Sequence, residues 1–497
     1  MRSGQRARTI ALALLAPIDG AWLGAFRIGY GLCLFASVSW ILVQSLWPAP
    51  GQTPWVDYHF LSSAFHFKYW GFSWVEVPSR AGLYALLYAL LGLSLCVAAG
   101  FCFRLSAWLL ALGFCWFSLL EAALYANHYY LMCLLGLLLA ASPAGRTLSI
   151  DAWWRARRGL RLRSDVPAVW LYLFRLQIGV VYFGASLAKA HGDWLVYAQP
   201  LRIWLSSQTD LPLVGPLFLE PWVAPLASWL GFLFDASIAF LLLVPRWRLA
   251  AYGGVIAFHV ATYVLFPRIV MFPVIMVMSA LVFFSPSWPR ELAARVRRRP
   301  VSVPAVHEPR GALGQGWVQR GGLALALVYA LWQVVLPLRF LAYGGDVRWH
   351  EQGLRFSWRV LHREKLGTVD FRVLSKHTGQ RWQLSPDVYL NQFQAVELAE
   401  QPDLIVQLAH HIRDDFARRG AGVVEVHADA LATLNGRRPA RLVDPDVDLA
   451  ALEPGLARAA WGRCLRASMK LGQCLRTHFW VILVQARGAR SFGRRRR

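Results

Sequence analysis

The amino-acid sequence predicts a polytopic α-helical membrane protein with about nine transmembrane helices, followed by an extracytoplasmic soluble domain that is mostly β or α+β. Composition is the first observation: 57% of the 497 residues are hydrophobic and only 16% are charged, whereas an ordinary soluble protein has about 25% charged residues. Distribution is the second, because long apolar runs fill residues 20–340 but not residues 341–497. We therefore expect a transmembrane domain at 1–340, a soluble domain at 341–461 and a basic tail at 462–497.

The apolar runs approach the length of about 20 residues that a helix needs to cross the bilayer core. The fourth and eighth runs are short, which indicates a tilted or partly re-entrant segment. The N-terminus has arginines before a short apolar stretch but no convincing cleavage site, so we interpret it as a lead-in rather than a signal peptide. The predicted spans are 20–44, 82–101, 105–123, 128–143, 168–190, 222–244, 248–266, 270–285 and 318–338.

Arginine distribution orients these spans, since cytoplasmic loops of membrane proteins are rich in Arg and Lys. With the N-terminus in the cytoplasm, the predicted inner loops hold arginine clusters such as 155–163 and 290–299. The predicted outer loops hold only Lys68, Arg80, Arg202 and Arg268. An odd number of spans then puts the soluble domain outside the cytoplasm. The abundant Ala, Arg, Leu and Trp favour a bacterial inner membrane, with a periplasmic domain, over the endoplasmic reticulum.

Two classes of function are disfavoured. The net charge of +24 could indicate nucleic-acid binding, but the arginines lie between apolar runs and form no basic stripe interleaved with aromatic residues. The cysteines have no metal-ligand spacing and no disulfide framework, so we expect no metal. A single Cys464–Cys474 disulfide is the one pairing that the sequence leaves open.

The soluble segment alternates as expected for strands. Residues 369–374 and 381–384 flank a turn that contains Gly379, and residues 423–427 and 438–443 flank a turn at Asn435–Gly436. Residues 403–419 have helical periodicity, and the stretch after Trp461 is a basic tail that we expect to be disordered or surface-bound.

Ionisable residues inside apolar spans are costly and usually serve a function. His128 begins the fourth span, Lys189 ends the fifth, and His259 lies towards the outer end of the seventh. The predicted topology puts all three at a similar depth near the outer face. Each alone has an ordinary explanation, because a histidine can pack in a core and a lysine at a span end often reaches the interface. Together they indicate one pocket with proton chemistry. Further polar residues within spans are Asp235, Arg175 and Gln177.

Lysine in apolar surroundings suggests a particular substrate. Such surroundings disfavour the charged ammonium form, and a neutral amine can accept a proton from a phenolic hydroxyl. An amine cannot directly deprotonate an ordinary carbon acid. Lys189 therefore suits a lipid-soluble phenol or quinol that reaches it from the bilayer.

Short motifs in a fixed order resemble the vitamin K-dependent γ-glutamyl carboxylase family, in its bacterial, HTTM-domain form. In the membrane part the resemblance is carried by Asn127-His128-Tyr129-Tyr130, Lys189-Ala190-His191-Gly192-Asp193-Trp194, Arg202-Ile203-Trp204-Leu205, Ala257-Phe258-His259 and Ser285-Pro286-Ser287-Trp288-Pro289. In the soluble part it is carried by Leu336-Pro337-Leu338, the segment 353–358 ending in Phe356-Ser357-Trp358, Leu384-Ser385-Pro386 and Asp444-Pro445-Asp446-Val447-Asp448. The resemblance runs from about Asp19 to Trp461.

The resemblance implies vitamin K-dependent γ-carboxylation of protein glutamate, coupled to oxidation of the reduced vitamin to its epoxide. The implied cofactor is phylloquinol or menaquinol, with O2 and CO2 as co-substrates, and the partners are a glutamate-containing protein or peptide and the lipid bilayer. Lys189 would be the initiating base, His128 would assist proton handling, and His259 would stabilise a charged intermediate. Substrate-binding roles fall to Asn127, Trp204 and Trp358, and we infer one for Arg202 because a guanidinium pairs bidentately with carboxylate.

Departures from the family pattern leave alternatives open. The soluble region is shorter than in the animal enzymes, which puts propeptide recognition in doubt, and Ala188 replaces a second lysine beside the base. A quinol epoxidase or oxidase that carboxylates no protein would keep the same membrane residues. A non-catalytic scaffold or transporter is the third possibility, although we find no inverted repeat.

Overall fold

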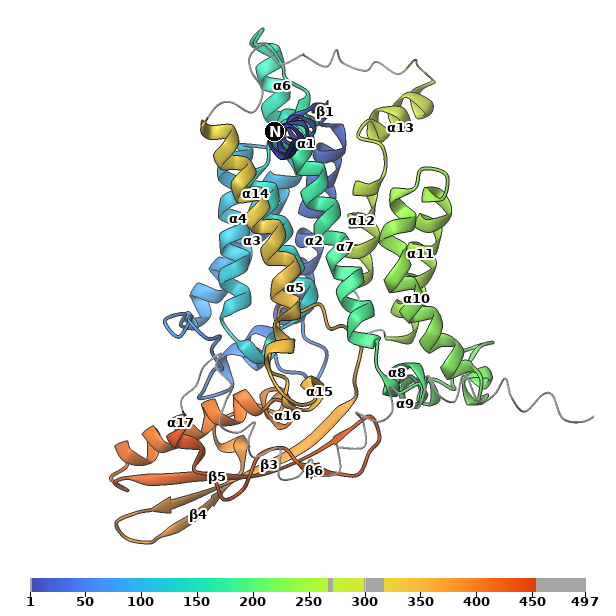
Figure 1. The fold of residues 1–497 in the computed structure, drawn as a ribbon. Coiled ribbons are helices and arrows are strands. Elements are labelled where there is room, and N and C mark those ends of the chain that lie inside the picture. Colours follow the sequence, from blue (N-terminus) through green and yellow to red (C-terminus); the bar gives the residue numbers. More distant parts are fainter. Residues whose placement is uncertain (1, 267–270, 299, 301–316, 453–497) are drawn as a thin grey trace, which may run out of the picture. The chain divides into compact units, whose positions relative to one another are not determined.

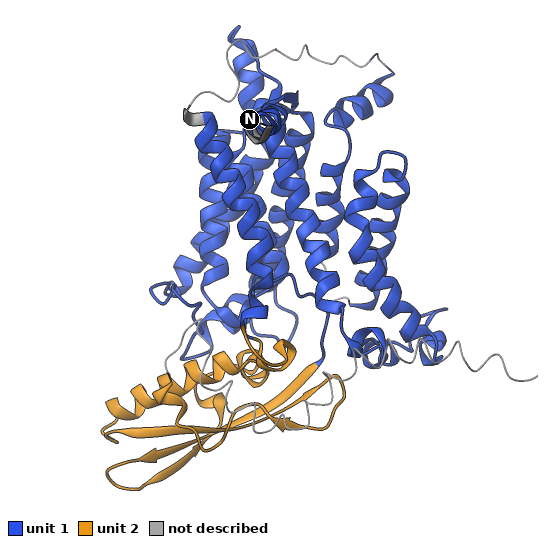
Figure 2. Cartoon of the chain, viewed as in Figure 1, with its two compact units in different colours: residues 1–342, 352–364 blue, residues 343–351, 365–497 orange. Residues whose placement is uncertain are grey.

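The computed structural model describes residues 2–266, 271–298, 300 and 317–452. The chain divides into two compact units (Figure 2). The helical unit comprises residues 1–342 and 352–364, and the sheet unit comprises residues 343–351 and 365–497. The predicted basic tail and the Cys464–Cys474 pair lie outside the described residues.

A helix lies within every predicted apolar span, and the long helices run side by side in a bundle (Figure 1). They are α2 (Ala21–Leu46), α3 (Arg80–Ala99), α4 (Phe103–Leu119), α5 (Asn127–Ala141), α7 (Ala168–Lys189), α10 (Val223–Leu243), α11 (Arg248–Leu265), α12 (Met271–Ser279) and α14 (Trp317–Val335). Shorter elements of this unit are α1 (Arg2–Leu15), α6 (Ile150–Arg157), α8 (Gly192–Leu195), α9 (Leu201–Ser206), α13 (Trp288–Arg297), and the antiparallel strands β1 (Pro17–Asp19) and β2 (Asp165–Pro167).

The helices confirm an integral membrane protein, but the number of spans stays a prediction. Within the described residues, six helices are long and apolar enough to cross a bilayer. The segment from α12 to Phe283 joins α13 at a bend of 94°, and this pair could form one more span. The remaining two, α4 and α5, are shorter apolar helices.

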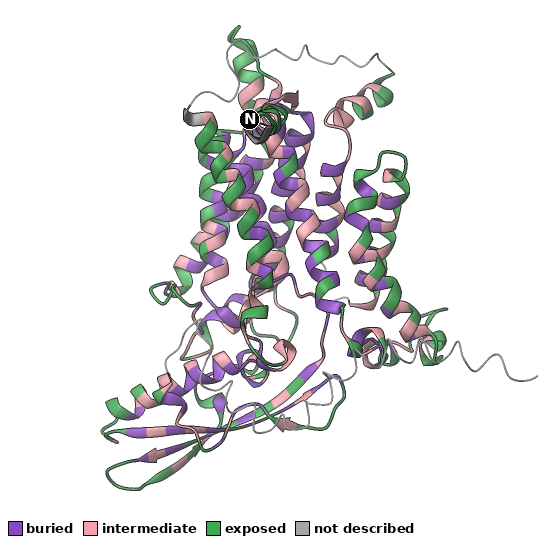
Figure 3. Ribbon diagram, viewed as in Figure 1, coloured by how far each residue is buried: buried purple, intermediate pink, exposed green. Residues whose placement is uncertain are grey.

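Helix α10 shows why this bundle suits a membrane. Its buried face carries small or polar residues, including Ser228, Gly231 and Asp235. Its exposed face carries Trp229, Leu233 and Phe240, and the same exposure runs along the outer helices (Figure 3). A soluble helix has the reverse arrangement, so we infer that lipid covers this outer face.

Buried arginines serve the architecture. The Arg27 guanidinium, with no exposed surface, donates to the carbonyls of Val97, Ala98 and Leu148 at 2.5–2.6 Å. Arg175 donates to the carbonyls of Val282, Phe283 and Phe284. Both satisfy carbonyls at or near helix ends, which would otherwise lack partners in an apolar medium. We therefore assign Arg175, a polar residue within a predicted span, a structural role.

The sheet unit is an α+β fold, as predicted. An antiparallel sheet of order β4-β3-β5-β6 contains β3 (Lys365–Ser375), β4 (Arg381–Leu384), β5 (Val424–Leu434) and β6 (Ala440–Arg441). Helices α16 (Gln392–Glu400) and α17 (Pro402–Arg418) pack on β3 and β5, and α15 (Val347–His350) is short. Both predicted turns are confirmed, and Asn435 and Gly436 have positive φ angles of 53° and 73°. Helix α16 was not predicted, although Asn391 and Gln394 form a capping box at its start.

Candidate active site

Lys189 is the last residue of α7 and forms a buried ion pair with Asp235, in the middle of α10. The distance from Nζ to Oδ2 is 2.7 Å, and the two side chains are only 7% and 5% exposed. Lys189 also donates to the carbonyl of Val360 at 3.5 Å. The two charges occupy an apolar environment, where an unpaired charge would be very costly. Each side chain therefore compensates the charge of the other, and the ion pair fixes the positions of both.

The ion pair follows from how α7 and α10 face each other. Ile178, Tyr182, Ala185 and Lys189 are spaced at helical intervals and are all buried, so they form one face of α7. On α10, the small residues Ser228 and Gly231 precede Asp235 on the buried face. Asp235 is 46 residues from Lys189 in the sequence.

Trp194 forms one wall of the lysine site. Its ring centroid lies 5.3 Å from the Lys189 Nζ, within cation–π range. Its indole N–H donates to the carbonyl of Ser228 at 2.9 Å, and its backbone N–H donates to His191 Nδ1 at 3.3 Å. The sequence following Lys189 thus folds into a short turn that returns to α10.

Residues 352–364, which we term the strap, form the other wall. Trp358 is fully buried and stacks on Tyr130 of α5, with ring centroids 4.9 Å apart. A Cβ atom at Gly184 of α7 would lie 2.8 Å from the Trp358 Cβ, so α7 needs glycine there. Positive φ angles at Phe356, Trp358 and Leu361 show that tertiary contacts, rather than local preference, determine the path of the strap.

Asn127 also holds the strap. Its Nδ2 donates to the carbonyl of Arg359 at 3.1 Å, and its Oδ1 accepts from the Tyr125 hydroxyl at 3.1 Å. The Tyr125 hydroxyl in turn accepts from the backbone N–H of Phe356 at 2.7 Å. Asn127 and Lys189 therefore bind neighbouring carbonyls of one segment, those of Arg359 and Val360. The adjacent His128 is half-buried, contacts Tyr129, and makes no hydrogen bond with another described residue.

His259 lies on α11 and reaches Tyr182 of α7. Its Nε2 is 3.2 Å from the Tyr182 hydroxyl, and its ring is 1% exposed. Phe234, Phe258 and Phe272 surround the ring, with centroids 5.3–6.5 Å away. Nδ1 has no hydrogen-bond partner among the described residues. Tyr182 is two helical turns from Lys189, about 10 Å along α7, so His259 is near the ion pair without contacting it.

Arg202 and Trp204 lie on α9. The Trp204 indole N–H donates to Glu364 at the end of the strap, and its ring contacts Phe266 with centroids 5.4 Å apart. Arg202 is exposed, and its Nε donates to the carbonyl of Tyr197 at 3.1 Å. Among the described residues it contacts neither Lys189 nor His259.

His362 is a candidate that the sequence pattern did not indicate. It is 3% exposed, and its Nδ1 has no hydrogen-bond partner among the described residues. Burial lowers the pKa of His362 well below its ordinary value, and the nearby charges of Arg363, Arg359, His191 and Lys189 lower it further. The imidazole is therefore neutral beside the lysine site. It lies outside the motifs that carry the family resemblance, so no sequence signal indicated it.

Gln177 was the remaining polar residue in a predicted span. Its Oε1 accepts from the Tyr329 hydroxyl of α14 at 2.5 Å, while its buried Nε2 has no hydrogen-bond partner among the described residues. Gln177 thus links α7 to α14, and nothing places it beside Lys189.

Two protein-family models match most of the chain. The model of the HTTM domain matches residues 15–288, which is more than half of the chain. The model of the vitamin K-dependent gamma-carboxylase lumenal domain matches residues 318–466. No solved structure matches the chain. The two matches follow one another along the sequence and include the lysine site, its strap and the sheet unit, so the chain belongs to the vitamin K-dependent γ-carboxylase family.

Proposed function

We propose that the protein carboxylates glutamate residues of a protein or peptide, coupled to epoxidation of reduced vitamin K by O2. The observation that carries this proposal is the buried Lys189–Asp235 pair, whose amine is held between a carboxylate and the carbonyl of Val360. Such a pair can release and accept a proton away from bulk water. The sheet unit would lie outside the cytoplasm, as the family description of a lumenal domain suggests.

The side chains around His259 are chemically suited to bind an aromatic quinol. The rings of Tyr182, Phe234, Phe258 and Phe272 lie around His259 and offer apolar contact to a ring system. With the Tyr182 hydroxyl as donor to Nε2, the neutral His259 carries its hydrogen on Nδ1. That unpartnered N–H can donate to an oxygen of the quinol. When bound, the reduced vitamin supplies a phenolic hydroxyl, reacts with O2 to give the epoxide, and so generates the base that removes the glutamate γ-proton before CO2 adds.

Asp235 gives Lys189 a way to become a base. The ammonium form cannot accept a proton, but transfer of one proton across the 2.7 Å hydrogen bond leaves a neutral amine and a neutral carboxylic acid. An apolar site favours this neutral pair over separated charges. The amine can then take the proton of a phenolic hydroxyl, and the ammonium that forms balances the negative charge left on the oxygen.

The other predicted residues receive narrower roles. His128 would assist proton handling at the outer end of α5. Asn127 and Trp204 hydrogen-bond to the strap, and Trp358 is its buried anchor; through the strap they would position the groups that face the substrate. Arg202 is exposed and would meet a substrate carboxylate as it arrives.

The test uses the full chain in detergent, supplied with reduced vitamin K, O2, labelled CO2 and a peptide that contains glutamate. Epoxide and fixed label are followed together for the wild type and for Lys189→Ala. We expect both products from the wild type and neither from the variant. Lys68→Ala is the matched control, because Lys68 also hydrogen-bonds a carbonyl and pairs with a carboxylate, Glu76, but lies in another part of the chain.

The other outcomes separate the competing functions. Epoxide without fixed label would indicate a quinol epoxidase that carboxylates no protein. Equal activity of Lys189→Ala and wild type, or no product from either, would overturn the mechanism and favour a scaffold.

A further inference from the structure

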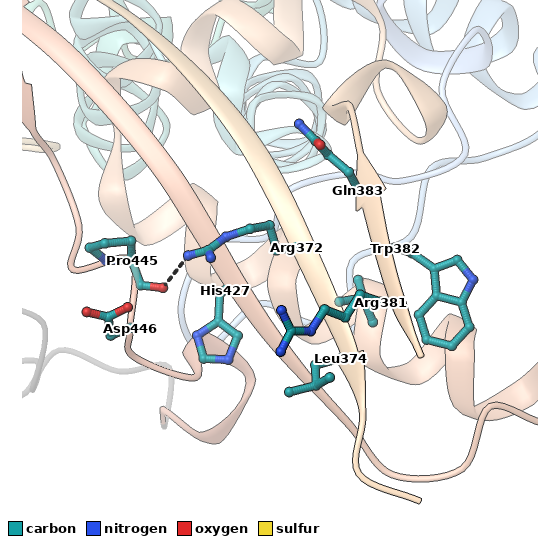
Figure 4. Close-up of a pocket in the computed structure, with 9 residues that line it drawn as sticks. Arg372, Leu374, Arg381, Trp382, Gln383, His427, Pro445 and Asp446 are labelled. Carbon is teal, nitrogen blue, oxygen red and sulfur yellow. Dashed lines mark hydrogen bonds between the residues drawn. The ribbon is translucent and has the colours of Figure 1, made fainter. Parts of the chain in front are cut away.

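The sheet unit has a groove on the face of its sheet opposite the buried core. The cavity has a volume of about 500 Å³. Alternate residues of β3 divide the two faces: Phe371 and Val373 are buried, whereas Arg372 is exposed. Figure 4 shows Arg372, Leu374, Arg381 and His427 projecting to one side and Trp382 to the other. The lining residues are Arg372, Val373, Leu374, Arg381, Trp382, Gln383, His427, Pro445 and Asp446.

Strand register brings the basic residues together. Arg372 is directly opposite Gln383 on β4 and His427 on β5, and Leu374 is opposite Arg381. Arg372 and Arg381 are therefore diagonal neighbours on one face, which places their backbones about 7 Å apart. Two guanidinium groups at this spacing can bind one carboxylate together or two successive ones.

Acidic side chains among the described residues form no ion pair with these two arginines. Arg372 donates to the backbone carbonyl of Pro445 at 2.8 Å, and Arg381 forms no ion pair with a described residue. Glu425, next to this row, is already bound by Lys376 at 3.0 Å and His427 at 3.4 Å. Among the residues that line the groove, Asp446 is the only carboxylate. The groove is consequently a cationic site with a single acidic residue.

We propose that this groove binds an acidic segment of the polypeptide substrate, outside the reaction centre. Guanidinium groups recognise carboxylates with paired, directional hydrogen bonds, and Leu374, beside Arg381 on the same face, offers an apolar contact. The identity of the occupant rests on the proposed function, because a glutamate carboxylase acts on polypeptides that carry glutamate. The groove retains the acidic segment while a glutamate elsewhere in the chain reacts.

Binding is measured with the full chain in detergent, by fluorescence anisotropy of a labelled twelve-residue peptide with several glutamates. A peptide with glutamine at those positions is the ligand control. We expect Arg381→Glu to weaken binding of the glutamate peptide by about tenfold, the loss typical of one charged hydrogen-bonded contact. Arg418→Glu on α17 is the matched control, since this arginine is exposed but lies on the opposite side of the sheet. The same Arg381→Glu variant should gain affinity for a peptide with lysine in place of glutamate.

Catalysis provides the second readout. Arg381→Glu should raise the KM for the long glutamate peptide and leave both kcat and KM unchanged for a pentapeptide with a single glutamate. Normal binding of the long peptide by Arg381→Glu, or equal affinity for the glutamate and glutamine peptides, would overturn the proposal. So would binding of inorganic phosphate or of vesicles of anionic lipid that displaces the peptide and is equally sensitive to Arg381→Glu, because the groove would then be a general anion or membrane site.

The two proposals can fail separately. If no carboxylation occurs but peptide binding depends on Arg381 and on glutamate, the groove stands and the proposed activity fails. If carboxylation occurs with a KM that is insensitive to Arg381, the activity stands and the groove fails.

Discussion

At the scale of single residues, Asp235 determines what Lys189 can do. The sequence identifies Lys189 and His259 because each brings a polar group into an apolar span. It identifies Asp235 only as another such group, since its partner is 46 positions away. Tyr182 and His362 could not be found in this way, because a tyrosine in a helix and a histidine in a connecting segment are both ordinary. Only the packing of α7 against α10 and the strap reveals their neighbours.

Replacing Asp235 by asparagine should abolish proton transfer while keeping the shape of the site. We expect epoxide formation to fall by about 100-fold or more, the range typical of a lost acid–base group. Asp235→Glu should recover part of the rate, because the carboxylate is restored with altered geometry. Asp210→Asn, an exposed acidic position in the loop before α10, should match the wild type. A wild-type rate for Asp235→Asn would exclude any role of Asp235 in the proton transfer.

Measurements of thermal stability distinguish the proposed chemical role of Asp235 from a purely structural role. Removing one partner of a buried ion pair costs about 3–5 kcal/mol, whereas replacing both partners by apolar residues is often neutral. We expect Asp235→Asn to lower the melting temperature in detergent and the double variant Lys189→Met, Asp235→Leu to restore it without restoring epoxide formation. A double variant that regains activity would contradict the proposed base.

At the scale of elements, the helices were predictable and the strap was not. Long apolar runs predict helices, and every expected span contains one. The strap has no periodic pattern, and its positive φ angles at bulky residues depend on contacts with Asn127 and Gly184.

Two glycines of α7 offer a matched test of strap docking. A Cβ at Gly184 would lie 2.8 Å from the Trp358 Cβ, but a Cβ at Gly179 would meet only the Ala239 side chain at 3.9 Å. We expect Gly184→Ala to destabilise the protein by about 1–3 kcal/mol through overpacking and to lower epoxide formation. Gly179→Ala should be neutral or stabilise by up to about 1 kcal/mol, because alanine favours helix. Thermal unfolding checks both, and equal behaviour of the two variants would argue against tight contact with Trp358.

The docking of the strap should depend on pH through His362. Its pKa is lower when the strap is docked than the ordinary value of about 6.5 expected when it is free. Protonation therefore favours the free strap: docking is fully stable above about pH 6.5 and weakens as the pH falls below it, by up to about 1.4 kcal/mol per pH unit. Hydrogen exchange of residues 352–364, corrected for the intrinsic pH effect, measures this. His362→Gln should remove the dependence, and an unchanged slope in that variant would assign it to another group.

At the scale of the whole molecule, the number of membrane crossings is the main prediction still to be tested. In the part of the chain that the structure describes, helix length alone distinguishes six long helices from the shorter α4 and α5 and the bent pair around Ser285. Arginine distribution predicts that all of them cross, because nine crossings place the arginine clusters that separate the apolar runs on the cytoplasmic side.

Cysteine labelling from one side of the membrane tests this count. In a cysteine-free background, Ser207→Cys and Thr378→Cys should react with an impermeant maleimide applied from outside sealed cells, since both positions are exposed and on the predicted outer side. Arg158→Cys should react only after the membrane is permeabilised. Nine crossings put Arg158 and Thr378 on opposite sides of the membrane. Labelling of both from the same side would show that an odd number of the segments between them does not cross as predicted.

The path of the chain through its two units constrains how such a protein can evolve. The polypeptide leaves the helical unit after Ala342, contributes residues 343–351 to the sheet unit, returns as residues 352–364, and leaves again at Lys365. The groups that complete the lysine site are thus encoded between two pieces of the other unit. A recombination event at the apparent domain boundary would separate Lys189 from the carbonyl that it binds. The two units therefore cannot be exchanged as independent modules. Any replacement of the sheet unit has to keep the strap, which belongs to the helical unit but lies between the two sequence segments of the sheet unit.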